Sequence, residues 1–256
     1  HRTIDKNLLE LNKQGFLNGH TPFSAVVAFI SLFAAYLVGA ENIVLSNEAS
    51  ANEGNTENGV NHQYSKSFDF EYDFNEYVKR NFTEKIHYFS LLRPFSELQI
   101  AKMFASRPEY RRVFRSCNRG SKQNIWCESC PKCLFVYGML SAFLSDGEMK
   151  EIFSSDMFEK EELIPDFRGL TGLDPVKPFE CVGTAEEYRT ALAMKILSLK
   201  REKRELPLLL RIFDDAFCCE DIVRESTALS DFNRENLVPE KFSECLTEMY
   251  SYVSNN

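Results

Sequence analysis

The stretch CNRGSKQNIWCESCPKC, residues 117–133, carries four cysteines with the spacing Cys117-x9-Cys127-x2-Cys130-x2-Cys133. Two intervening residues allow a tight turn that brings both thiolates to one ion at about 2.3 Å, and four sulfurs fill a tetrahedral shell. A closed shell leaves no open position for water, so the spacing predicts a structural zinc site. An iron–sulfur cluster uses the same four thiolates and remains an alternative, whereas disulfides are disfavoured in a reducing, cytoplasmic setting.

The composition around this motif is that of an ordinary globular protein. The chain has 256 residues, of which 44% are hydrophobic and 27% charged. Its 30 basic and 38 acidic residues give a net charge of −8. A protein whose main partner is a nucleic-acid backbone needs a basic surface, so we expect no nucleic-acid partner. A small anionic ligand in a local pocket remains compatible with this charge.

The most apolar stretch is AVVAFISLFAAYLV, residues 25–38. A membrane span needs about 20 apolar residues, and shorter runs are more often buried helices. We therefore expect no membrane insertion, and predict a buried core helix that begins at Pro22 and ends at Gly39.

Two short apolar segments predict strands, ENIVLS at 41–46 and IHYFSLL at 86–92. Helical patterns follow them at 68–82 and from Ser96, where Gln99 completes a capping box. This alternation is typical of an α/β sheet, whose ligand site lies at the strand ends. The long polar segment between the first strand and the next helix is therefore a candidate functional loop.

Beyond the cysteines the pattern becomes helical. We predict helices at 134–144, 184–200, 204–217 and 238–253, with a capping box formed by Thr184 and Glu187. A soft boundary near residue 146 divides the chain into an α/β part, 1–146, and a mainly helical part, 147–256.

Two sets of motifs resemble known families. RPFSELQIA at 93–101, followed by the cysteine spacing, resembles the C-terminal part of the PP-loop ATP pyrophosphatases, such as 7-cyano-7-deazaguanine synthase, which ends in a similar zinc loop. A second set is similar to the MurL-like UDP-N-acetylmuramoyl-L-alanyl-L-glutamate epimerases. It comprises NGHTP at 18–22, SNEASAN at 46–52, NHQYSKS at 61–67 and KPFECVGT at 177–184.

The resemblance implies the fold and the reaction. Residues 1–146 would be the C-terminal part of a PP-loop (adenine nucleotide alpha hydrolase-like) parallel-sheet domain, with the zinc loop at 117–133. The implied reaction inverts the terminal L-Glu of UDP-MurNAc-L-Ala-L-Glu to D-Glu in peptidoglycan precursor synthesis. It would consume ATP, form AMP and diphosphate, and use Mg²⁺ on the phosphates. The family's Ser-Gly-Gly-x-Asp-Ser turn is absent here, so the chain would be either a C-terminal fragment or a degenerate relative. The first residue is not Met, which favours the fragment, so we expect the turn upstream of His1 and expect this chain alone to be inactive.

The similar motifs also supply the candidate site residues. Inversion requires proton removal on one face of a carbon and delivery on the other, and the candidate acid–base residues are Cys181, His62, Lys66 and Glu48. Cys181 precedes a helix N-terminus that would lower its pKa, although a packed thiol is the alternative. The candidate substrate or nucleotide contacts are His20, Ser46, Asn47, Asn52, Gln63, Tyr64 and Ser65.

Two other functions remain open at this point. One is a different PP-loop enzyme that adenylates a carboxylate and traps it with a nitrogen nucleophile. The other is a zinc-stabilised interaction module without catalysis. The expected partners of the leading hypothesis are ATP and the UDP-MurNAc dipeptide, in the cytoplasm.

Overall fold

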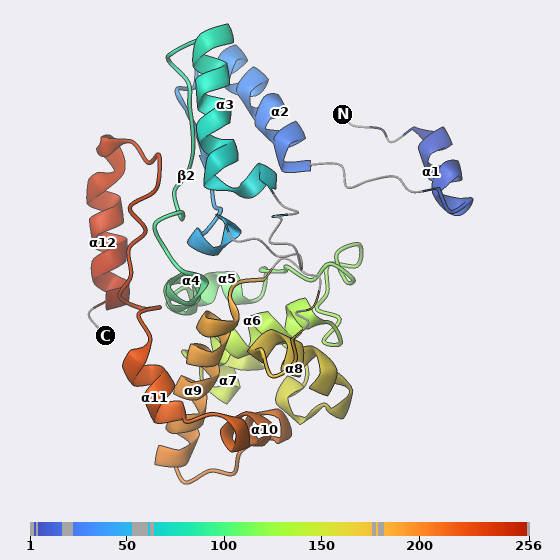
Figure 1. Cartoon of the computed structure of the whole chain (residues 1–256), viewed down its shortest axis with the longest axis vertical. Helices are drawn as coiled ribbons and strands as arrows, with labels where there is room; N and C mark the ends of the chain where they lie inside the picture. Colours follow the sequence, from blue (N-terminus) through green and yellow to red (C-terminus); the bar gives the residue numbers. More distant parts are fainter. Residues whose placement is uncertain are drawn as a thin grey trace.

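The computed structural model describes residues 3, 5–16, 23–52, 61, 64–175, 178 and 182–254. This part of the chain is mainly helical and contains a two-stranded parallel sheet (Figure 1). Its strands are β1 (Asn42–Leu45) and β2 (His87–Ser90). Its helices are α1 (Lys6–Lys13), α2 (Phe23–Val38), α3 (Phe68–Asn81), α4 (Glu97–Ala105), α5 (Pro108–Arg111), α6 (Pro131–Ser141), α7 (Asp146–Met149), α8 (Ile164–Thr171), α9 (Ala185–Arg201), α10 (Leu208–Ala216), α11 (Cys219–Glu225) and α12 (Ser243–Ser254).

The sheet pairs the two predicted strands, which confirms both of them. Asn42 lies opposite His87, and Leu45 lies opposite Ser90. Parallel neighbours need a crossover connection, and α3 lies within it and packs on β2. The contact is aromatic, because the Phe74 and Tyr88 rings lie 4.8 Å apart. The polar segments that follow β1 and precede α3 are thereby brought to one end of the sheet.

The helix predicted from residues 25–38 is present, but its predicted complete burial is wrong. Only Ala28, Leu32 and Ala35 of α2 are buried, and their spacing marks one helical face. That face belongs to the core around Phe74, whereas Phe33 on another face is 64% exposed. A continuous apolar run in the sequence predicts a helix, but it does not predict how many faces of that helix pack against other elements. None of the described helices combines the length and the apolar character that crossing a bilayer requires.

The helices from α4 to α11 enclose the largest hydrophobic core. α6 and α9 pack at its centre, where Gly138 of α6 lies against Tyr188 of α9. A Cβ added at Gly138 would lie 2.3 Å from the Tyr188 ring, so the close approach requires glycine. The Tyr188 hydroxyl donates a hydrogen bond to the Leu134 carbonyl at 3.1 Å. This core supports the cysteine loop, which immediately precedes α6.

Both predicted capping boxes, at Ser96 of α4 and Thr184 of α9, are confirmed. The predicted helix at 134–144 begins earlier, at Pro131, because Cys130 rather than a later residue accepts the first-turn hydrogen bond. The short helices α8 and α11 were not predicted from the sequence. Each has at most eight residues and buries part of its surface in the large core, so packing rather than local propensity stabilises it.

Candidate active site

A cavity of about 440 Å³ lies between the polar segments near the sheet and the cysteine loop. It opens at the carboxyl end of β1, which is where α/β proteins commonly bind ligands. The residues that the two polar motifs contribute to its wall are Ser46, Asn47, Glu48, Ser50, Ala51, Asn61 and Lys66. The two motifs, which are separate in the sequence, therefore form one lining.

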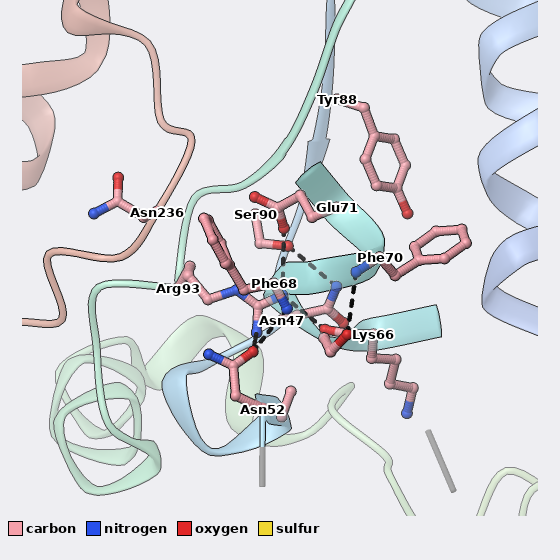
Figure 2. Close-up of polar contacts among 12 residues, drawn as sticks. Asn47, Asn52, Lys66, Phe68, Phe70, Glu71, Tyr88, Ser90, Arg93 and Asn236 are labelled. Carbon is pink, nitrogen blue, oxygen red and sulfur yellow. Dashed lines mark hydrogen bonds and ion pairs between the residues drawn. The ribbon is translucent and has the colours of Figure 1, made fainter. Parts of the chain in front are cut away.

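Two candidate acid–base residues, Glu48 and Lys66, line this cavity together. Both residues are partly buried. The Lys66 side chain extends away from the polar network that holds its backbone (Figure 2). Neither the Glu48 carboxylate nor the Lys66 ammonium forms an ion pair with another described residue. A carboxylate and an ammonium are thus available to a ligand in the cavity.

Four sequence-predicted site residues lie outside the described part of the chain: His20, His62, Gln63 and Cys181. Their roles stay predictions. The sequence neighbours of two of them, Asn61 and Val182, are in the cavity wall. The Asn61 side-chain amide donates to the Ala51 carbonyl at 2.8 Å, which joins the two polar motifs at the cavity.

The buried guanidinium of Arg93 holds both polar motifs in place. Arg93 is 0% exposed. One of its terminal nitrogens donates to the Glu48 carbonyl at 2.9 Å and to Asn52 Oδ1 at 3.2 Å. The other donates to the Lys66 carbonyl at 2.7 Å and to the Glu71 carboxylate at 3.3 Å (Figure 2). Arg93 therefore fixes the backbone of Glu48 and Lys66, the two candidate acid–base residues in the cavity wall.

Two predicted ligand contacts, Asn47 and Asn52, already have partners within the protein. The Asn47 amide donates to the Ser90 hydroxyl at 3.1 Å and still lies in the cavity wall. Asn52 Oδ1 accepts from Arg93 and from the Phe68 N–H at 2.7 Å, and Asn52 is outside the described wall. The structure therefore places Asn52 in the Arg93 network that supports the cavity.

The remaining predicted contacts divide between the cavity and its surroundings. Ser46 is exposed and lines the cavity. Ser65 and Tyr64 both lie outside the described wall of the cavity. Ser65 is buried, and the Tyr64 hydroxyl donates a hydrogen bond to the Asp73 carboxylate at 2.9 Å. The hydrogen bond to Asp73 raises the pKa of Tyr64.

The four cysteines of the 117–133 loop come together as a candidate metal site. Their sulfurs all lie within 4.8 Å of one another. Cys127 Sγ and Cys130 Sγ are 3.7 and 3.4 Å from Cys133 Sγ. A tetrahedral zinc site with bonds of about 2.3 Å places its sulfurs about 3.8 Å apart. The four are free thiols rather than disulfides, and the donor set fits a single ion.

The four sulfurs differ in how easily they ionise. Burial raises the pKa of Cys127 and the contact with Cys130 raises that of Cys133, whereas the pKa values of Cys117 and Cys130 are lowered. The sulfur contact with Cys133 lowers the pKa of Cys130 to about 5. Burial opposes ionisation of Cys117, but backbone N–H groups of Cys127 and Gly120 donate to its sulfur at 3.5 and 3.1 Å and lower its pKa. Because thiolates are the metal-binding form, Cys117 and Cys130 are the two ligands whose surroundings already favour binding of a cation.

The cysteine loop is anchored to the helical core through Trp126 and Glu128, which flank Cys127 in the sequence. The Glu128 carboxylate accepts from the Ser154 N–H at 2.6 Å and pairs with Lys160 at 3.8 Å. The adjacent Trp126 ring is buried, with its centroid 4.9 Å from that of Phe153. A change at the cysteines should therefore disturb the neighbouring core.

If the four cysteines hold a metal ion, replacing Cys130 with serine should abolish metal binding and lower the free energy of unfolding by at least about 4 kcal/mol, the size typical of a lost metal site. Metal analysis of the purified protein and urea denaturation measure the two effects. Cys245→Ser is the matched control, because Cys245 is exposed and distant in sequence from the cluster. Equal metal content and stability in both variants would contradict a metal-binding role for the cluster.

Several residues of the site were not predicted from the sequence. Glu97, Ser116 and Lys132 line the cavity, and Arg93 supports it. Arg93 follows directly after an apolar predicted strand in the sequence. A charged residue is unusual in this context, and this could have indicated its structural role. The position of Lys132 between two cysteines gave no such signal, because only the folded loop brings it to the polar motifs.

The chain matches two family models of known proteins. Residues 1–91 match the family model described as the MurL N-terminal domain, and residues 113–221 match the MurL C-terminal domain. The first match contains both polar motifs, and the second contains the cysteine loop. No solved structure matches the chain.

Curated relatives carry one name, UDP-N-acetyl-alpha-D-muramoyl-L-alanyl-L-glutamate epimerase. The protein of Xanthomonas oryzae pv. oryzae is 39% identical over 223 residues, which cover 84% of this chain and 49% of the relative. That of Micromonospora sp. is 37% identical over 220 residues, covering 83% and 49%. The chain thus spans about half the length of the curated relatives it matches. Its two domain matches and these relatives show that the chain belongs to the MurL family.

Proposed function

We propose that this protein is an ATP-dependent epimerase that inverts the terminal L-Glu of UDP-MurNAc-L-Ala-L-Glu to D-Glu. The observation that carries the proposal is the shared cavity of Glu48 and Lys66, two candidate acid–base groups from separate motifs. The substrate is the one in the name of the relatives. A cavity of about 440 Å³ is within the usual size of small-molecule sites, about 300–1,000 Å³.

The proposed chemistry begins with activation of the carboxylate that neighbours the reacting carbon. The α-proton beside a free carboxylate is very weakly acidic, because its removal creates a dianion. Transfer of AMP from ATP to this carboxylate, with release of diphosphate, makes it acyl-like and stabilises the enolate. Hydrolysis of the adenylate after reprotonation returns the carboxylate and releases AMP.

Inversion then needs one group to remove the proton and another to deliver a proton on the opposite face. Glu48 and Lys66 supply this pair within the cavity, and Ser46 and Asn47 orient the ligand through their polar groups. Arg93 acts through the backbone carbonyls of the pair, and therefore positions them without touching the ligand.

The remaining parts of the proposal follow from the family resemblance and the donor set. Zinc is the proposed ion of the cysteine cluster, held by four thiolates, and its role is to tie the loop into the fold. ATP with Mg²⁺ is the proposed co-substrate, bound through a PP-loop-type fold. We also propose the division near residue 146 and a cytoplasmic role in peptidoglycan precursor synthesis.

Incubating the complete protein with MgATP and UDP-MurNAc-L-Ala-L-Glu should form D-Glu, AMP and diphosphate together. Chiral analysis of glutamate after acid hydrolysis, and nucleotide chromatography, measure the products. Omission of ATP is the control and should leave the glutamate unchanged. AMP without a change of chirality would reject the epimerase and favour an enzyme that traps the adenylate with a nitrogen nucleophile.

A further inference from the structure

The cysteine loop contributes its own polar side chains to the proposed reaction cavity. Lys132, which stands between Cys130 and Cys133, lines the cavity, and so does Ser116, which precedes Cys117. The cysteine cluster is therefore next to the cavity, and the residues beside its ligands face the same space as the polar motifs.

The cavity wall holds two carboxylates, Glu48 and Glu97, and two ammonium groups, Lys66 and Lys132. Two features on the side of the cysteine loop favour an anion there. Lys132 is partly buried, and its ammonium forms no ion pair with a described residue. Lys66, which the polar motif at 61–67 contributes to the same cavity wall, also forms no ion pair with a described residue. The Ser116 hydroxyl is buried and has no hydrogen-bond partner within the described part of the protein. A buried hydroxyl without a partner costs free energy unless a ligand or water satisfies it.

The local backbone adds to this preference. Lys132 lies in the first turn of α6, and Phe135 and Val136 of the same helix also line the cavity. The N-terminal end of a helix carries a partial positive charge. The chain as a whole has a net charge of −8, so an unpaired lysine in a concave site is a local exception rather than part of a basic surface.

We propose that Lys132, presented by the cysteine loop, binds a phosphate group of a substrate in this cavity, with the Ser116 hydroxyl as a second contact. The proposal rests on the proposed function, because it takes the cavity as the reaction site. Lysine binds phosphate as a point charge. Two substrates of the proposed reaction carry phosphates, the nucleotide triphosphate and the UDP-linked dipeptide, and the experiment distinguishes them.

The direct test is isothermal titration of the complete, metal-loaded protein with three probes: inorganic diphosphate, UDP-MurNAc-L-Ala-L-Glu and MgATP. Lys132→Ala should weaken binding of diphosphate and of at least one substrate by about ten- to hundredfold, the effect of losing a hydrogen bond to a charged group. Lys132→Arg should restore most of the affinity. Lys122→Ala is the matched control, because Lys122 is an exposed lysine of the same loop outside the described wall.

The pattern across probes identifies the source of the phosphate. A loss confined to UDP-MurNAc-L-Ala-L-Glu and diphosphate assigns Lys132 to the nucleotide sugar, whereas a loss confined to MgATP and diphosphate assigns it to the nucleotide. Unfolding midpoints and metal content equal to those of Lys122→Ala show that the variant is folded. Unchanged affinity for all three probes in folded Lys132→Ala would overturn the proposal.

Failure of this proposal is distinguishable from failure of the proposed function. Epimerisation by the unmodified protein, with unchanged binding in Lys132→Ala, would reject only the role of Lys132. Conversely, a protein that binds diphosphate through Lys132 but converts no L-Glu to D-Glu would retain the anion site and reject the epimerase.

Discussion

Replacing Arg93 with methionine should lower the free energy of unfolding by about 3–5 kcal/mol, the usual effect of removing one partner of a buried ion pair. The Arg93 and Glu71 side chains are 0% and 1% exposed, so the variant leaves a carboxylate buried without its cation. The carbonyls of Glu48 and Lys66 lose their donor as well. Urea denaturation followed by circular dichroism measures the change.

Arg80 and Glu76 provide a matched control for this measurement. Their nitrogen–oxygen distance is 3.3 Å, equal to that of Arg93 and Glu71, but their side chains are 76% and 35% exposed. Arg80→Met should therefore cost less than about 1 kcal/mol, because exposed pairs contribute little. Equal losses in Arg80→Met and Arg93→Met would contradict a structural role for the buried pair.

A double variant separates stability from positioning. Arg93→Met combined with Glu71→Leu removes both charges, and should recover part of the stability lost in Arg93→Met alone. Both variants lack the hydrogen bonds from the Arg93 guanidinium to the carbonyls of Glu48 and Lys66. The kcat of the proposed epimerisation should therefore be low in Arg93→Met and should remain low in the folded double variant. Full recovery of kcat would show that Arg93 only stabilises the protein.

The elements that sequence analysis predicted correctly are those with strong local signals. Alternation of apolar strands with capped helices identified β1, β2 and α4, since Ser96 and Gln99 satisfy orphan backbone groups of α4 whatever lies around it. The cysteine spacing likewise brought four thiolates together, as predicted. In each case the physical cause lies within one short, continuous stretch of the chain.

The features that were missed depend on distant contacts. The exposed face of α2 reflects the absence of a partner among the described residues, which an apolar run does not reveal. The role of Arg93 depends on carbonyls of Glu48 and Lys66, 45 and 27 residues away. Lys132 reaches the cavity only because the large core sets the cysteine loop beside the sheet end. The periodicity of apolar residues in the sequence carries no information about contacts between such distant residues.

Removing either proposed acid–base residue should slow inversion by about 10²–10⁴-fold, the usual contribution of general acid–base catalysis. Lys66→Ala and Glu48→Gln are the variants, and chiral analysis of the glutamate measures inversion. Lys85→Ala is the control for loss of a lysine, because Lys85 is exposed and outside the cavity wall. Inversion at the unmodified rate in either variant would remove that residue from the mechanism, whereas no inversion by the unmodified protein would favour a non-catalytic module.

Deuterium exchange tests whether the two groups act on opposite faces. A variant that keeps one of the two bases can still remove the α-proton of the isomer that faces this base. It then returns deuterium from D₂O to the same face, so the α-hydrogen is exchanged but the configuration is not inverted. Glu48→Gln and Lys66→Ala should therefore each exchange the α-hydrogen of only one isomer, and the two variants should exchange opposite isomers when supplied with L-Glu and D-Glu forms of the precursor. Exchange of the same isomer by both variants would place Glu48 and Lys66 on one face. A different residue would then have to deliver the second proton, and His62 and Cys181, whose sequence neighbours line the cavity, would be the next variants to make.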